Sequence, residues 1–77
     1  MKISGGRNYV KFDLENGDIV KAEGEILLGR KFVVYKATMK YLAGFHKGEK
    51  LSSEQIQDII FEVQRMTNEN TVQLVFE

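Results

Sequence analysis

The sequence predicts an α+β domain: an antiparallel β-meander with one helix packed on one face, in the order β-β-β-α-β. Three observations predict it. Apolar and polar residues alternate over 9–14, the pattern of a half-buried strand. Residues 52–66 combine a helix cap with apolar residues at helical spacing. A second alternating segment, 71–76, follows the helix and completes the sheet. We expect a single domain over 1–77.

Turn residues separate the expected strands. Asn16-Gly17 is a strong hairpin signal between the first strand and the second, which covers 19–28. Gly24 marks a bulge or bend within the second strand. The third strand, 31–36, is rich in aromatic and β-branched residues. The side chains expected to face the helix are Val10, Phe12, Leu14, Val20, Ala22, Ile26, Phe32, Val34, Val72, Leu74 and Phe76.

One helix covers only one face of such a sheet. The opposite face carries Val33, Tyr35 and Val75, together with Tyr9 and Ile19, among charged residues. Antiparallel sheets tolerate a solvated face. The alternative is a homodimer through Val33, Tyr35 and Val75.

The helix begins with two recognisable capping features. Ser52 and Gln55 fit a capping box, in which each side chain satisfies a backbone N–H of the other residue. Leu51 and Ile56 occupy the two positions of a hydrophobic staple. The apolar residues that define the buried face are Ile56, Ile59, Ile60, Val63 and Met66.

Phe61 breaks this pattern. It lies about 140° around the helix from Ile56, on the polar side with Asp58 and Arg65. A large apolar group there needs a cover. Either the connection over 38–50 folds against it, or a partner binds it.

The connection between the third strand and the helix is long for so small a domain. We expect a short helical turn around 39–43. Tyr41, Leu42 and Phe45 either close the open end of the core or reach Phe61.

The charges are balanced overall but separated along the chain. Eleven basic residues match eleven acidic ones, which argues against a general nucleic-acid binder. Residues 30–50 hold six basic residues and one acidic residue, whereas 13–25 and 51–77 each hold five acidic residues and one basic residue. Either these segments neutralise one another, or they steer a charged partner.

No catalytic, metal or cofactor motif is present. His46, the only histidine, lies near Glu49 and Ser52, but Ser52 serves the helix cap, so no pair of nucleophile and base is formed. The glycine-rich segment 4–7 precedes a strand rather than a helix, which favours a flexible lead-in over a phosphate loop. We therefore expect a protein that is not an enzyme and holds no metal or cofactor.

Composition also indicates a compartment. The chain has no cysteine, no signal-peptide pattern and no apolar run long enough to cross a membrane. We expect a soluble, cytoplasmic protein without membrane contact.

The candidate function is therefore binding, through two groups of residues. The first is an apolar anchor with a charged rim: Phe61, Asp58, Glu62 and Arg65. The second is Tyr41, Phe45, His46 and Lys47 in the long connection. Its mixture of basic and aromatic residues leaves weak binding of single-stranded nucleic acid as a further alternative.

Several segments together resemble the bacterial immunity protein 74 family. They are the start of the chain, 1–10, the segment 20–25, the strand 32–36, the helix 51–63 and the end of the chain, 72–77. Members of that family are antidotes encoded beside polymorphic toxins. The resemblance implies a protein that binds and blocks a cognate toxin domain and has no chemistry of its own.

Overall fold

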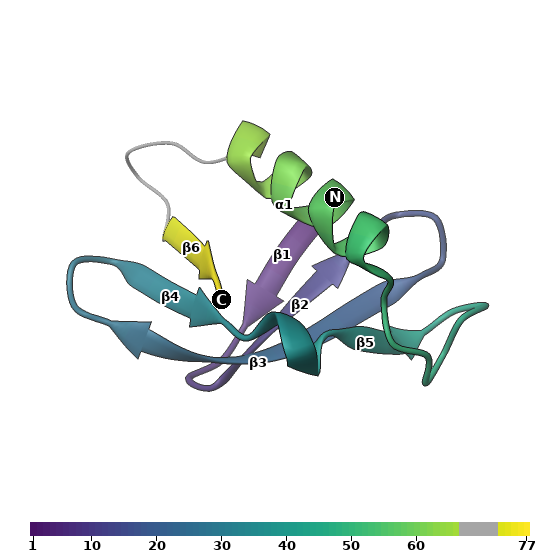
Figure 1. Cartoon of the computed structure of the whole chain (residues 1–77), viewed down its shortest axis with the longest axis horizontal. Helices are drawn as coiled ribbons and strands as arrows, with labels where there is room; N and C mark the ends of the chain where they lie inside the picture. The colour runs from purple at the N-terminus through teal and green to yellow at the C-terminus, as the bar shows by residue number, and fades with distance from the viewer. Residues whose placement is uncertain (67–72) are drawn as a thin grey trace.

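The computed structural model describes residues 1–66 and 73–77 (Figure 1). The predicted α+β class, a mostly antiparallel sheet with one helix, is confirmed. The elements in chain order are β1 (Lys2–Gly5), β2 (Tyr9–Asp13), β3 (Ile19–Leu27), β4 (Lys31–Val34), the short 3₁₀ helix η1 (Lys36–Thr38), β5 (Lys40–Ala43), α1 (Ser53–Met66) and β6 (Gln73–Phe76).

Strand β3 organises the sheet. One of its edges pairs with β2, and the strand order on the main path is β1-β2-β3-β4-β6. The other edge of β3 pairs with two strands: the first part of β3 pairs with β5, and the last part of β3 pairs with β4. Figure 1 shows β4 and β6 at one end of β3, β5 at the other end, and α1 on one side of the sheet.

The start of the chain differs from the expected flexible lead-in. Strand β1 pairs with β2 along its whole length and forms an edge of the sheet. Its turn is closed by the Gly6 N–H, which donates to the Tyr9 carbonyl at 3.0 Å. Gly5 is required there, since a Cβ at this position would lie 2.6 Å from the Tyr9 carbonyl oxygen. Four residues are too few to reveal a strand by alternation.

The expected helical turn at 39–43 is also wrong. The helical turn lies earlier, in η1, and Lys40–Ala43 forms β5. Tyr41 pairs with Val20, and both side chains are buried in the core. Burial of an aromatic residue against the sheet outweighs the weak local preference for a helix.

The last strand runs parallel to β4, which departs from an entirely antiparallel meander. An antiparallel neighbour needs only a hairpin, whereas a parallel one needs a long crossover. The segment between β4 and β6 contains η1, β5 and α1, and it supplies that crossover. Residues 71 and 72 of the predicted strand lie outside the described residues.

The core lies between the sheet and α1. Its largest fully buried side chains include Phe12 and Met39, and the Phe12 ring stacks on that of Phe76 with centroids 6.1 Å apart. Ile26 is a wrong prediction, because its side chain is 63% exposed on the β3–β4 hairpin, which extends beyond α1 in Figure 1. Of the other predicted inward residues, those buried are Val10, Phe12, Val20, Ala22, Phe32 and Val34, those partly buried are Leu14, Leu74 and Phe76, and Val72 is outside the described residues.

Thr38 lies where the pairing of β3 with β5 ends and its pairing with β4 begins. The Glu23 N–H donates to the Thr38 hydroxyl oxygen at 2.8 Å, and that hydroxyl donates to the Tyr35 carbonyl at 2.7 Å. The Tyr35 N–H completes the bridge by donating to the Glu23 carbonyl at 2.9 Å. Thr38 thus joins η1 to β3 between β4 and β5.

Replacing Thr38 by valine is expected to lower the free energy of unfolding by about 0.5–1.5 kcal/mol, because the Glu23 N–H loses its protein acceptor while the shape is kept. Urea denaturation measures this change. Ser53→Ala, which removes an exposed hydroxyl, is the control and should change stability by less than about 0.5 kcal/mol. Equal midpoints for Thr38→Val and the wild type would contradict this role.

Candidate functional site

The capping box that starts α1 is present as predicted. The Ser52 N–H donates to Gln55 Oε1 at 2.8 Å, and the Gln55 N–H donates to Ser52 Oγ at 3.2 Å. Leu51 is buried just before the cap, and Ile56 is half-buried after it. The rotation of the helix is therefore set at its first turn, and with it the side chains that face outward.

Phe61 lies on the outward side of α1. Ile59 and Val63 are buried, whereas the Phe61 side chain is 60% exposed. Met66, expected on the buried face, is also exposed, to 42%, at the end of the helix. The 38–50 connection does not provide the cover, because Tyr41 is buried in the core and Phe45 is itself exposed.

Replacing Phe61 by aspartate is therefore expected to change the free energy of unfolding by less than about 0.5 kcal/mol, as exposed substitutions usually do. The matched control is Ile59→Asp on the buried face of the same helix, which should remove more than about 2 kcal/mol. Both values come from urea denaturation. A large loss for Phe61→Asp would show that this ring is covered within the chain.

The charged residues around Phe61 are only weakly engaged. Arg65 Nη1 lies 3.1 Å from Glu62 Oε1, one helical turn apart, and both side chains are about half exposed. Exposed pairs of this kind contribute roughly 0–1 kcal/mol. A partner can therefore replace this ion pair at little cost. We call Asp58, Phe61, Glu62 and Arg65 the helix patch.

The loop after β5 is held by hydrogen bonds that its backbone N–H groups donate. The Gly48 N–H donates to the Tyr41 carbonyl at 2.7 Å, and the Phe45 N–H donates to Asp18 Oδ1 at 3.1 Å. Gly44 adopts a φ of 101°, a region that favours glycine, and a Cβ there would clash with Asp18. The loop therefore has a defined shape and is joined to the β2–β3 turn.

Aromatic rings gather on this loop. The His46 ring centroid lies 5.2 Å from that of Tyr41 and 5.7 Å from that of Phe45. His46 Nδ1 also lies 3.0 Å from Glu49 Oε2. These contacts orient His46, while the Phe45 side chain next to it is 96% exposed. We call Tyr41, Phe45, His46 and Lys47 the loop patch.

A shallow depression of about 310 Å³ is lined by residues of both patches. Tyr41 of the loop patch lines it together with Asp58 and Glu62 of the helix patch. Burial raises the pKa of the Tyr41 hydroxyl, and the Asp18 and Glu49 carboxylates add to the shift. The remaining predicted site residues, Phe45, His46, Lys47, Phe61 and Arg65, do not line this depression.

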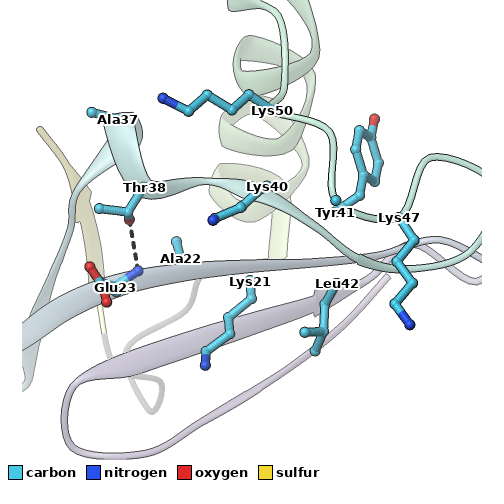
Figure 2. Close-up of a pocket in the computed structure, with 11 residues that line it drawn as sticks. Lys21, Ala22, Glu23, Ala37, Thr38, Lys40, Tyr41, Leu42, Lys47 and Lys50 are labelled. Carbon is cyan, nitrogen blue, oxygen red and sulfur yellow. Dashed lines mark hydrogen bonds between the residues drawn. The ribbon is translucent and has the colours of Figure 1, made fainter.

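A larger groove, of about 650 Å³, was not predicted (Figure 2). Four lysines line it: Lys21 from β3, Lys40 from β5, and Lys47 and Lys50 from the loop. The excess of basic residues over 30–50 indicates three of them. Lys21 belongs to an otherwise acidic segment, so only the pairing of β3 with β5 reveals that it joins the others.

The family model of immunity protein 74 matches residues 2–77. This chain belongs to the immunity protein 74 family. Membership supports a role in a toxin system and, in general, a protein partner. No match was found among curated proteins or among solved structures.

The described part of this immunity protein 74 member shows neither a metal-site pattern nor a membrane-spanning helix. Residues 1–66 and 73–77 contain no group of three or more His, Asp or Glu side chains that could hold a metal ion. Over the same residues, no helix is both long and apolar enough to span a membrane. The two patches and the groove are the candidate binding surfaces of the described residues.

Proposed function

We propose that this immunity protein 74 member is a non-enzymatic antidote that binds its cognate toxin domain and blocks it by steric occlusion. The observation that carries the proposal is Phe45, a ring almost fully exposed on a loop whose backbone is held in place. Aromatic side chains are frequent anchors of protein interfaces. A loop whose backbone is already held loses less conformational entropy on binding than a flexible one.

The helix patch extends the proposed interface. Phe61 is exposed there with Asp58, Glu62 and Arg65 around it, the arrangement of an apolar anchor with a polar rim. One depression is lined by Tyr41 of the loop patch and by Asp58 and Glu62 of the helix patch, which supports an interface that includes both patches. A single toxin domain would contact both.

We place this encounter in the bacterial cytoplasm, where the antidote would protect the cell that makes the toxin. The chain has no cysteine, which is consistent with a reducing compartment.

The test is co-expression with the toxin encoded by the adjacent gene. We expect the two proteins to purify as a complex that survives a high-salt wash, and we expect the toxin in that complex to be inactive. An unrelated toxin is the control and should neither bind nor be inhibited. Failure to form a complex with an active adjacent-gene toxin would overturn the proposal.

A self-associating subunit is the alternative, and the outer sheet face offers it little surface. The Val33 side chain is only 6% exposed, because β4 is a central strand and Glu25 and Val75 flank Val33 in register. Tyr35 is the most exposed of the three residues expected there.

Sedimentation at micromolar concentration is therefore expected to show a monomer. A dimer that dissociates when Tyr35 is replaced by aspartate would favour the alternative instead. The matched control is Ile3→Asp on edge strand β1, an equally exposed position that should leave the sedimentation coefficient unchanged.

A further inference from the structure

Four lysines lie in line across adjacent backbone segments. Lys11 of β2 lies opposite Lys21 of β3, Lys21 lies opposite Lys40 of β5, and Lys40 pairs with Lys50. Neighbouring strands are about 4.8 Å apart, and directly opposed like charges destabilise a sheet. We call these four residues the lysine row. Nothing in the packing of the core requires lysine at these exposed or half-exposed positions.

The lysine row is poorly neutralised within the described residues. None of the salt bridges recorded there involves Lys11, Lys21, Lys40 or Lys50. Lys11 and Lys21 lie over the Tyr9 ring, with Nζ 5.6 and 5.3 Å from its centroid, so a cation–π contact stabilises this end of the row. The ammonium groups at the other end have no such contact among the described residues.

That other end forms the groove of Figure 2. Lys47 joins Lys21, Lys40 and Lys50 around it, whereas Glu23 is its single acidic lining residue. Ala22, Ala37 and Leu42 add apolar surface. Figure 2 shows Lys40 and Lys50 extending toward the side of the groove on which Ala37 and Thr38 lie. The groove is therefore concave, positively charged and partly apolar.

We infer that this groove binds an acidic segment of the toxin, whose carboxylates neutralise the lysine row. This inference rests on the proposed function and adds the chemistry of the partner. Charge complementarity supports the inference. Lysines that repel one another across neighbouring strands are stabilised most by a partner segment with several negative charges. The groove adjoins the loop patch through Lys47 and Tyr41, so one partner reaches Phe45 and the groove together.

An acidic protein segment fits better than single-stranded RNA. Binding sites for single-stranded nucleic acid combine basic residues with exposed aromatic faces on which bases stack. Tyr41 is the aromatic residue in the lining, and its side chain is buried. The chain has zero net charge, so it also lacks the excess of basic residues that is typical of nucleic-acid binders.

The first test uses defined probes and the full chain. An oligoglutamate peptide is titrated into the ¹⁵N-labelled protein. A single-stranded oligouridylate of equal charge is titrated separately and represents the alternative ligand, single-stranded nucleic acid. We expect saturable shifts of the amide signals of Lys21, Lys40, Lys47 and Lys50, weakened by salt. The Lys21→Ser/Lys40→Ser variant should bind the peptide roughly tenfold more weakly. Its melting temperature should stay close to that of the wild type, because removal of the like-charge pair offsets loss of the Lys21–Tyr9 contact.

The matched control is Lys2→Ser/Lys31→Ser, which removes the same charge from exposed positions outside the groove. It should bind the peptide within about twofold of the wild type, since screening leaves distant charges little effect. An equal loss of peptide binding by the control variant would show that net charge alone explains the effect, and it would overturn the inference. So would the absence of saturable shifts, or tighter binding of the oligouridylate at the same residues.

The second test separates this inference from the proposed function. The adjacent-gene toxin is titrated with the wild type and with Lys21→Ser/Lys40→Ser. Weaker binding by the variant alone supports the groove as the site of an acidic segment. Equal binding by both overturns the groove while the antidote function stands. No binding even by the wild type overturns the antidote function itself.

Discussion

Replacing Phe12 by alanine is expected to remove about 3–5 kcal/mol of stability, the range for truncating a buried phenylalanine. Phe12 is fully buried on β2, lies opposite Val20 and stacks on Phe76 of the last strand. A domain of this length has roughly 4–12 kcal/mol in total. We therefore expect the variant to lose at least about a quarter of the total stability and to unfold at a much lower urea concentration.

Urea denaturation followed by circular dichroism measures the Phe12→Ala effect. Phe45→Ala is the matched control, since it deletes the same atoms from an exposed ring and should change stability by less than about 0.5 kcal/mol. Similar midpoints for the two variants would mean that the sheet does not pack on α1 as described.

Replacing Phe45 by aspartate is expected to weaken binding of the toxin by about 2–4 kcal/mol, which is roughly thirty- to a thousandfold in Kd. The reason is that an exposed aromatic ring on a loop with a held backbone is suited to be an anchor, and a carboxylate is costly to bury in its place. Isothermal titration calorimetry with the adjacent-gene toxin measures the change.

The control for Phe45→Asp is Leu28→Asp on the β3–β4 hairpin. Leu28 is also 96% exposed, but it lies outside both patches. Its substitution should leave Kd within about twofold, as changes outside an interface do. If Leu28→Asp weakens binding as much as Phe45→Asp does, the interface lies on the hairpin instead.

The helix was predictable because its signals are local. Ser52 and Gln55 are three residues apart, and the periodicity of Ile59 and Val63 needs no knowledge of the rest of the fold. The same periodicity predicts that Phe61 faces outward. Met66 departs from it because a stripe of residues does not reveal where the sheet below the helix ends.

Strands β1 and β5 were not predictable from local pattern. Each has only four residues, and each depends on its neighbours: Ile3 pairs with Phe12, and Tyr41 pairs with Val20. The parallel pairing of β6 with β4 likewise follows from the path of the whole chain after Val34. Long-range pairing, and not residue type, decided these elements.

The candidate site, like the fold, was predictable only where its features depend on local sequence. Sequence reasoning selected Phe61 and Phe45, and the structure places both rings in exposed positions. It did not predict that Tyr41 lines one depression with Asp58 and Glu62, because that arrangement depends on how α1 packs on the sheet. The groove could not be predicted from the sequence, because only the register of β3 and β5 places Lys21 opposite Lys40.

The central claim is that the exposed rings of Phe45 and Phe61 form the surface that binds the toxin. Hydroxyl-radical footprinting of the free protein and of its complex with the adjacent-gene toxin tests it most directly. We predict rapid oxidation of Phe45 and Phe61 in the free protein, strong protection of both in the complex, and no change at Leu28. Unchanged oxidation of both phenylalanines in the complex, or protection of Leu28 instead, would contradict it.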